Sequence, residues 1–333
     1  MFVELAILIL SMALIVASSE LFTNSVEWLG QRFSFSEGVV GSVFAAIGTA
    51  LPETFVPLIA VLSFGDQQGN EVSVGAINGS PFMLSTLTFG LCGLFIWIFS
   101  KRGRRELALN LDTRVLRRDL GFFIGAFSLV LLLSFIPLDA SIRMVLGCLI
   151  ILLYPVYLIR SFRAEGEVGE EPDALYLARP FKWSSKNSAL IVSQIVLSLL
   201  GIVCGAYFFV GEIQDISVAL GFPAQVLAIM ISPVATEFPE KMNSILWIRK
   251  GKDTMALGNV TGALVFQGTI LGGFGVAFTK WNLGLDAKVS AAIAIVSALA
   301  VLILLLKNRL TYKVLALGVI TYLVCITSFI LAK

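Results

Sequence analysis

Long apolar runs separated by short polar connections make up most of this chain. The runs cover about residues 1–29, 37–64, 71–100, 119–137, 141–160, 188–210, 222–248, 254–279, 287–306 and 312–331. Most are close to the roughly 20 residues that a helix needs to cross the hydrocarbon of a bilayer. The first run lacks the basic start of a cleaved signal peptide, so we expect it to be retained. The pattern predicts an all-α polytopic membrane protein with ten transmembrane helices, the longer ones tilted or broken.

The composition agrees with a lipid environment and narrows the chemistry. Of 333 residues, 57% are hydrophobic and 14% are charged, against roughly 25% charged in an average soluble domain. The absence of histidine excludes a histidine relay, a histidine-ligated metal and a Ser-His catalytic pair. We expect no resident cofactor, no nucleic-acid partner and no enzymatic activity, with an intramembrane hydrolase built on two carboxylates as the minor alternative. The cysteines stand singly in apolar runs, where packing is their expected role: Cys92, Cys148, Cys204 and Cys325.

The placement of basic residues predicts the orientation. Lysine and arginine collect on the cytoplasmic side of membrane proteins. If the N-terminus lies outside, the inward connections hold most of the 24 basic residues, and the outward side keeps Arg143, Lys280, Lys288 and the terminal Lys333. We therefore expect both termini to be extracytoplasmic, in a protein of the prokaryotic inner membrane that acts as a monomer.

A polar segment near the middle divides the predicted helices into two groups of five. It covers residues 161–187, between a first half at 1–160 and a second half at 188–333. A solvated cytoplasmic linker is the simpler interpretation, and an ion-sensing or regulatory cluster is the alternative. The alternative rests on an acidic run within this segment: Glu165, Glu167, Glu170, Glu171 and Asp173.

The two halves contain related sequences. An offset of 187 positions places Thr49-Ala50-Leu51-Pro52-Glu53 on Thr236-Glu237-Phe238-Pro239-Glu240, and an offset of 183 places Gly75 and Gly79 on Gly258 and Gly262. Such a match indicates an internal repeat. Because each half has an odd number of predicted spans, the second enters the membrane from the opposite side. The sequence therefore predicts two inverted five-helix repeats whose related stretches meet near the midplane.

These stretches carry oxygen ligands in an apolar setting, where ionisable groups are costly. Pro52 and Pro239 are expected to break their helices and free carbonyl oxygens. Thr49 with Glu53, and Thr236 with Glu240, stand four residues apart on one helical face. Carboxylate and hydroxyl oxygens suit calcium and sodium. We predict a cation site on this set, with purely structural, hydrogen-bonded carboxylates as the alternative. The further candidate ligands are Ser80, Asn259, Glu237 and Gln267.

Two further pairs leave a choice of roles. Ser80 and Asn259 fall level with the carboxylates and suit either ligation or helix packing. Glu237 and Lys241 stand at i and i+4 with the acid first, a favourable orientation for an ion pair. They form either a self-neutralised structural bridge, or a device in which Lys241 replaces a bound monovalent ion and makes transport proton-linked or uncoupled.

Together these residues resemble the cation/calcium exchanger superfamily, whose two repeats carry G-T-S-L-P-E followed by G-N-x-x-G-S-x-x-x-N or D. The first repeat has Gly48-Thr49-Ala50-Leu51-Pro52-Glu53 and Gly75-Ala76-Ile77-Asn78-Gly79-Ser80, and the second has Ala235-Thr236-Glu237-Phe238-Pro239-Glu240 and Gly258-Asn259-Val260-Thr261-Gly262. The resemblance implies exchange of calcium for a monovalent cation by alternating access, with the first and sixth helices sliding across the core.

Carried over by position, the resemblance makes Glu53 and Glu240 the central calcium-bridging carboxylates, with Thr49 and Thr236 as flanking donors. The departures from the motifs are Ala50, Glu237, Ala76, Ala263, Leu84 and Gln267, the last two standing where the family has Asn or Asp. These changes remove oxygens that the family uses for sodium, so sodium, a proton or no ion at all remain open for coupling. Exchange of another cation (magnesium, manganese or a monovalent ion) and a passive cation channel are the alternatives.

Overall fold

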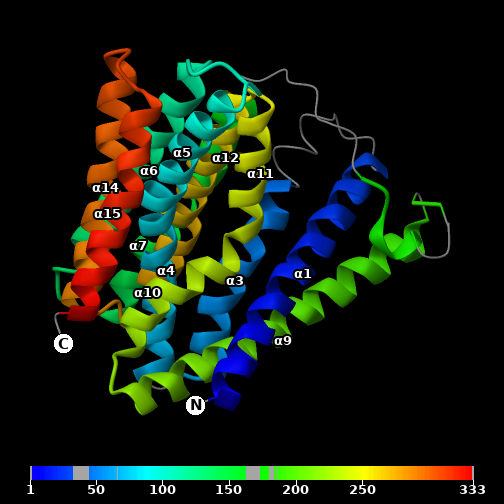
Figure 1. Ribbon diagram of the computed structural model, residues 1–333. Coiled ribbons are helices and arrows are strands. Elements are labelled where there is room, and N and C mark those ends of the chain that lie inside the picture. The colour runs from blue at the N-terminus through cyan, green and yellow to red at the C-terminus, as the bar shows by residue number, and fades with distance from the viewer. Residues whose placement is uncertain are drawn as a thin grey trace.

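The computed structural model describes residues 2–32, 45–65, 67–162, 173–179, 184–185 and 187–331, and over these residues it consists of helices and connections without a strand (Figure 1). The first half holds α1 (Phe2–Arg32), α3 (Ala45–Ser63), α4 (Gln67–Met83), η2 (Leu84–Thr88), α5 (Phe89–Lys101), α6 (Thr113–Leu133), α7 (Ala140–Ile151) and α8 (Leu153–Phe162). A short η3 (Tyr176–Ala178) follows. The second half holds α9 (Ser188–Leu220), α10 (Ala224–Thr236), α11 (Phe238–Arg249), α12 (Asp253–Phe266), η4 (Gln267–Leu271), α13 (Gly272–Phe278), α14 (Leu285–Leu306) and α15 (Tyr312–Leu331).

The helices have the lengths and surfaces of membrane spans. Within the described residues, seven are long and apolar enough to cross a bilayer: Phe2–Leu29, Gln67–Lys101, Ala140–Ser161, Ser188–Leu220, Asp253–Phe278, Leu285–Leu306 and Tyr312–Leu331. Pro52–Ser63 and Ala224–Thr236 are shorter apolar helices. Large apolar side chains such as Val145, Leu200 and Leu323 are more than half exposed, and lipid is the environment in which such exposure carries no penalty. The chain is an integral multi-pass membrane protein, as the sequence predicts.

One irregularity occurs at matching places in the two halves. Helix α4 continues through the π-helical segment η2 into α5, and α12 continues through η4 into α13. The π segments begin at Leu84 and Gln267, which are related by the same offset of 183 as the glycines of the sequence repeat. In both, a threonine hydroxyl donates back to the carbonyl four residues earlier: Thr86 to Phe82, and Thr269 to Val265. The sequence repeat therefore has a counterpart in backbone geometry.

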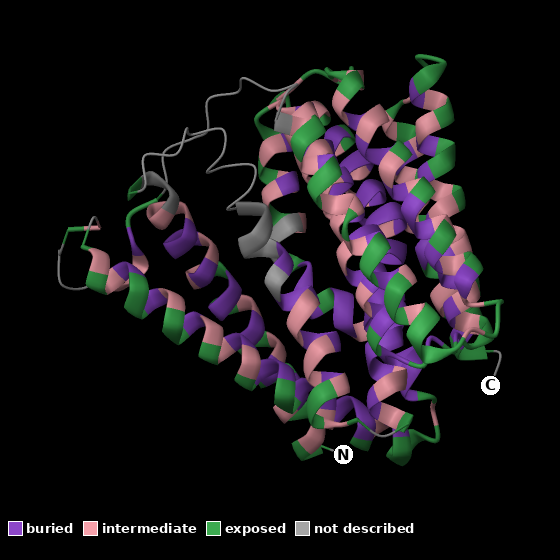
Figure 2. Cartoon of the chain, turned by 180° about the vertical axis from the view of Figure 1, so that it is seen from behind, coloured by how far each residue is buried: buried purple, intermediate pink, exposed green. Residues whose placement is uncertain are grey.

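Glycine residues allow helices from the two halves to cross at a short distance. A Cβ at Gly90 on α5 would meet the Val319 backbone of α15 at 2.4 Å, and one at Gly273 on α13 would meet the Gly147 backbone of α7 at 2.6 Å. Glycine is thus required where these helices cross. The last helix of each half contacts the third span of the other half. Fully buried aromatic residues, including Phe82, Phe89, Phe123 and Phe127, belong to the main hydrophobic core. Figure 2 shows buried positions gathered on the inner sides of the helices.

Helices α1 and α9 lie side by side at one edge of the molecule (Figures 1 and 2). Their contacts run in opposite directions, because Gly201 packs on Ser18 whereas the later Gly205 packs on the earlier Ile15. These are the first and sixth predicted spans. Part of the segment between the halves is fastened onto this pair: the Asp173 carbonyl accepts hydrogen bonds from Asn24 Nδ2 (2.9 Å) and Trp28 Nε1 (2.8 Å). Residues 163–172, which include most of the acidic run, lie outside the described residues.

The two related stretches differ at their prolines. In the second half, α10 ends at Thr236 and α11 begins at Phe238, with Glu237 between them at φ −99° and ψ 11°. This confirms the predicted break before Pro239. In the first half the predicted break before Pro52 is wrong, because α3 is continuous from Ala45 to Ser63 with Pro52 inside it. A proline removes only one helical hydrogen bond, and neighbouring helices in a bundle can tolerate that loss.

Candidate functional site

Four polar side chains from four separate elements are buried among the spans. Glu53 lies on α3, Ser80 on α4, Glu237 at the break between α10 and α11, and Gln267 at the first position of η4. Their exposed fractions are 3%, 2%, 0% and 1%. Burial of two carboxylates in a membrane span is costly unless they are paired or bind a ligand. These residues are the candidate site.

The side-chain amide of Gln267 joins the two carboxylates. Its Nε2 donates to Glu53 Oε1 at 3.3 Å and to Glu237 Oε1 at 3.4 Å. The Ser80 hydroxyl is a further hydrogen-bonding neighbour of the Glu237 carboxylate. One nitrogen therefore occupies the point where an acid from each half of the chain converges.

The break in the helix positions Glu237. Pro233 and Pro239 flank it, and the missing N–H and the ring of a proline disfavour a continuous helix. The Glu237 N–H still donates to the Pro233 carbonyl, and its carbonyl accepts from the Lys241 N–H, both at 3.2 Å. The side chain consequently leaves the helical register at the break and points towards Gln267 and Glu53.

Lys241 contacts the same carboxylate from the other side. Its Nζ donates to Glu237 Oε2 at 3.1 Å and to the Pro233 carbonyl at 3.1 Å. The Lys241 side chain is 12% exposed, and that of Glu237 is 0% exposed. The ion pair considered from the i, i+4 spacing is therefore present. The Pro233 carbonyl near the end of α10 therefore accepts from two donors, the Glu237 N–H and the Lys241 ammonium.

The remaining predicted ligands have other partners or cannot be placed. The Thr236 hydroxyl donates within its own helix, to the Ser232 carbonyl at 3.2 Å. Asn259 donates to Ser244 Oγ at 3.1 Å, which ties α12 to α11. The side chains of Thr49 and Glu240 lie outside the described part of the structure, although their backbones belong to α3 and α11. Their roles stay predictions.

Asn78 is a polar residue of this region that was not predicted as a ligand. It is 1% exposed, and its Nδ2 donates to the Val74 carbonyl at 2.8 Å. Its Oδ1 has no hydrogen-bond partner among the described residues, and the same holds for Oε1 of Gln267. An unsatisfied buried oxygen is an unusual feature that a bound ion would explain. The amide side chain within the G-A-I-N-G-S stretch is the sequence signal that could have identified it.

The donor set fits a hard cation. Carboxylate, amide and hydroxyl oxygens are the ligands of calcium and magnesium. In the described ranges no group of three or more His, Cys, Asp or Glu side chains has the arrangement of a metal site, so the acids here need amide and hydroxyl oxygens beside them. An ion in the place of Gln267 Nε2 would require each carboxylate oxygen to move about 1 Å closer. It would also require the amide to turn and present Oε1.

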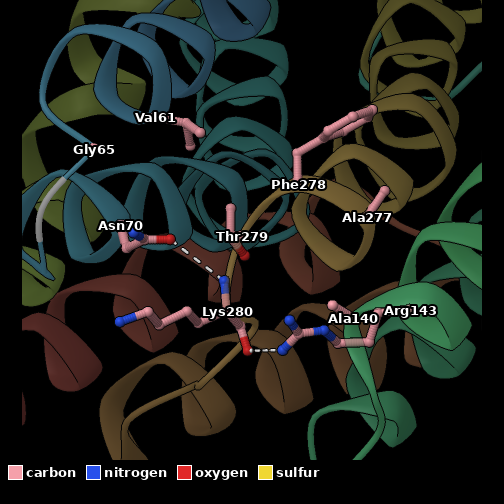
Figure 3. A pocket seen from close by; sticks show the side chains of 9 residues that line it. All are labelled: Val61, Gly65, Asn70, Ala140, Arg143, Ala277, Phe278, Thr279 and Lys280. Carbon is pink, nitrogen blue, oxygen red and sulfur yellow. Dashed lines mark hydrogen bonds between the residues drawn. The ribbon is translucent and has the colours of Figure 1, made fainter.

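A pocket elsewhere on the molecule has the opposite character (Figure 3). It has a volume of about 340 Å³ and lies between the end of α3, the start of α7 and the end of α13. Its polar lining comes from Asn70, Arg143, Thr279 and Lys280. Arg143 Nη1 donates to the Lys280 carbonyl at 2.6 Å, and the Lys280 N–H donates to Asn70 Oδ1 at 3.3 Å. With two cationic side chains and no carboxylate in its lining, it does not suit a cation.

Comparison with known proteins decides the family. The family model described as "Sodium/calcium exchanger protein" matches residues 3–163 and 190–331, which is nearly the whole chain apart from the segment between the halves. The chain belongs to this family. It is therefore a membrane cation exchanger and not an enzyme, and the resemblance inferred from the two motifs is confirmed.

Relatives of this exchanger include archaeal, bacterial and vertebrate proteins. The sodium/calcium exchanger MaX1 of Methanosarcina acetivorans is 25% identical over 293 residues, covering 78% of this chain and 79% of that protein. The inner membrane protein YrbG of Escherichia coli is 25% identical over 291 residues, covering 84% and 81%.

Two solved structures show the same fold at low identity. The H+/Ca2+ exchanger CAX superposes with a TM-score of 0.68 and 18% identity over 98% of this chain and 81% of that one. The sodium-calcium exchanger NCX_Mj, soaked with Na+ and Sr2+, superposes with a TM-score of 0.61 and 19% identity over 98% and 99%.

Proposed function

We propose that this exchanger transports calcium, or a divalent cation of similar chemistry, against a monovalent cation or a proton by alternating access. Glu53 and Glu237 are the proposed carboxylate ligands, with Gln267 and Ser80 beside them. The observation that carries the proposal is that one amide nitrogen lies within 3.3 and 3.4 Å of both carboxylates. This is where the two halves bring negative charge together. Glu240, which the sequence predicts as a central ligand, stays a proposed ligand, as do the predicted oxygen donors Thr49, Thr236 and Asn259.

The architecture proposed with this function is ten spans in two inverted repeats. The matching π segments and the antiparallel course of α1 and α9 support it. In this arrangement α3, α6 and the pair α10–α11 complete the set of spans beside the seven long apolar helices. Both termini would face the outside of a prokaryotic inner membrane, and the linker at 161–187 would face the cytoplasm. Alternating access would come from movement of α1 and α9 together across the remaining helices.

Purified protein in liposomes tests the site. We expect Glu53→Gln and Glu237→Gln each to lower calcium binding by calorimetry, and ⁴⁵Ca²⁺ uptake, at least tenfold. Each change removes a charge of the ligand set while keeping the shape of the side chain. Glu106→Gln, in the exposed connection after α5, is the matched control and should behave as wild type. Normal binding and uptake by both site variants would show that the site is assigned wrongly.

The same preparation separates the alternatives. A panel of calcium, magnesium, manganese, sodium and potassium identifies the transported cation by competition with ⁴⁵Ca²⁺. An exchanger saturates with substrate at slow turnover and needs a cation on the opposite side. A passive channel carries a current proportional to voltage and needs no cation on the opposite side. A current proportional to voltage from the purified protein would show that it is a passive channel and not an exchanger.

A further inference from the structure

Lys241 makes the candidate site different from a simple pair of acids. Of the two oxygens of Glu237, Oε1 accepts from Gln267 and Oε2 accepts from Lys241. The site therefore already contains a positive charge, covalently attached to the chain at a distance of 3.1 Å from one ligand carboxylate. A dication arriving at Glu237 meets this ammonium, and like charges in a low-dielectric region repel strongly. Binding of the dication to both oxygens and the Lys241 contact exclude each other.

The contacts of Lys241 allow its side chain to change conformation. Its second contact is to the Pro233 carbonyl at the helix break, also 3.1 Å away, so the ammonium bridges the two helix ends at that point. Glu237 is fully buried, whereas Lys241 keeps 12% of its side chain exposed. A lysine stem has four rotatable carbons that can carry the ammonium towards a wetter region without moving the backbone. The pair can open from the lysine side while the carboxylate stays in place.

We infer that Lys241 acts as a tethered monovalent cation of the transport site. When the substrate cation is absent, its ammonium neutralises Glu237. When the substrate cation binds, the ammonium leaves Oε2 and frees it. Without such an ammonium, an exchanger must bind a cation from solution beside its carboxylates before the site can return across the membrane without calcium. Here the chain supplies that charge, so calcium transport does not require sodium. This inference rests on the proposed function for the identity of the substrate.

Sodium dependence tests the inference. We expect ⁴⁵Ca²⁺ flux by wild-type protein in liposomes, measured under one fixed opposing proton gradient, to be the same with sodium, potassium or choline on the opposite side. In Lys241→Gln the tethered charge is missing, and sodium should take its place beside Glu237. We therefore expect flux in this variant to rise at least tenfold with sodium over choline. Lys241→Arg keeps the charge and should stay insensitive to sodium. Lys313→Gln, at an exposed lysine near the start of α15, is the control for loss of a positive charge and should match wild type.

Sodium binding gives a second readout that does not depend on calcium transport. We expect sodium to raise the melting temperature of Lys241→Gln by several degrees and to leave that of wild type unchanged. This can be measured on unpurified membranes if the variant is too unstable to purify without sodium. A sodium effect on the variant alone supports the tethered charge even if calcium proves not to be the substrate. A wild-type flux driven by sodium overturns the inference, as does a Lys241→Gln variant that ignores sodium in both measurements.

Discussion

The carboxylates of Glu53 and Glu237, from opposite halves of the chain, share one hydrogen-bond donor, the Nε2 of Gln267. Two acids held this close repel each other unless something positive or polar stands between them. In the structure that group is an amide, and in the proposed transport cycle it is a cation. The relationship makes Gln267 as informative a position as the acids themselves.

Gln267→Leu removes the shared donor and an amide oxygen while nearly keeping the volume of the side chain. We expect calcium affinity, measured by calorimetry, to fall at least tenfold. We also expect the free energy of unfolding to fall by about 1–3 kcal/mol, because two buried carboxylate oxygens lose a hydrogen-bond donor. Gln68→Leu, at the half-buried second position of α4, should change neither quantity. Calcium binding by Gln267→Leu at wild-type strength would remove Gln267 from the ligand set.

The pairing of Glu237 with Lys241 predicts non-additive effects on stability. Lys241→Gln alone leaves a buried carboxylate unpaired, which costs roughly 3–5 kcal/mol in buried pairs. Glu237→Gln with Lys241→Gln removes both charges and should unfold at a higher temperature than the single variant Lys241→Gln. Melting temperatures in detergent without added cations measure all members of the cycle. If the losses of stability in the two single variants add up to the loss in the double variant, the two side chains do not interact.

The close crossings of α5 with α15 and of α13 with α7 predict which glycines resist substitution. Gly90→Ala and Gly273→Ala place a methyl group 2.4 and 2.6 Å from backbone atoms of the facing helix. We expect each to destabilise the protein by roughly 1–3 kcal/mol, because backbone atoms cannot move aside easily. Gly121→Ala on α6 meets nothing within 4 Å and should be neutral or raise the melting temperature. A melting temperature unchanged in all three would contradict the interleaved packing.

The connection between the halves should resist protease as long as it is fastened to α1 and α9. Asn24→Leu removes the bond to the Asp173 carbonyl and those that Asn24 Oδ1 accepts from Tyr176 and Gln194. We expect chymotrypsin to cut after Tyr176, which is followed by Leu177, several times faster in this variant. Asn282→Leu, at an exposed asparagine after α13, is the control. Unaltered cleavage would show that the contact holds nothing in place.

A hydrogen bond from Tyr176 to Glu20 also holds this connection on α1, and we expect it to persist at mildly alkaline pH. Tyr176 donates its hydroxyl to Glu20 at 2.8 Å. Burial, with the hydrogen bond to Glu20 and its charge, raises the pKa of Tyr176 to about 12. Tyr176 donates this hydrogen bond only as the neutral phenol, which is the main form at pH values below the pKa. The hydrogen bond is therefore lost only as the pH rises through about 12. Chymotrypsin cleavage after Tyr176 should therefore be equal at pH 7 and pH 9, after correction with a peptide substrate. Faster cleavage at pH 9 would contradict a protonated Tyr176.

The sequence predicted the features that depend on local chemistry. Apolar runs give helices because lipid leaves backbone groups no other partners, and the repeat pointed to Glu53 and the stretch around Glu237. The motif match made Glu240 the equivalent of Glu53, and that assignment stays a prediction; the structure adds Glu237, whose carboxylate accepts from Gln267 as that of Glu53 does. That outcome depends on where the helix breaks between Pro233 and Pro239, and two prolines six residues apart leave several possible break points. The continuity of α3 through Pro52 has the same origin, since tertiary packing decides whether a proline ends a helix or only bends it.

The crossing of each half's last helix over the other half also bears on how the protein is made. The face of α5 that carries Gly90 is covered by α15, whose facing residue Gly318 lies near the end of the chain. At a synthesis rate of about 5–20 residues per second, that partner emerges roughly 10–45 s later. During this interval the face of α5 that carries Gly90 has no α15 to pack on and is exposed to lipid. We expect a nascent chain stopped before residue 312 to be inserted but unassembled, and therefore a target for membrane quality control.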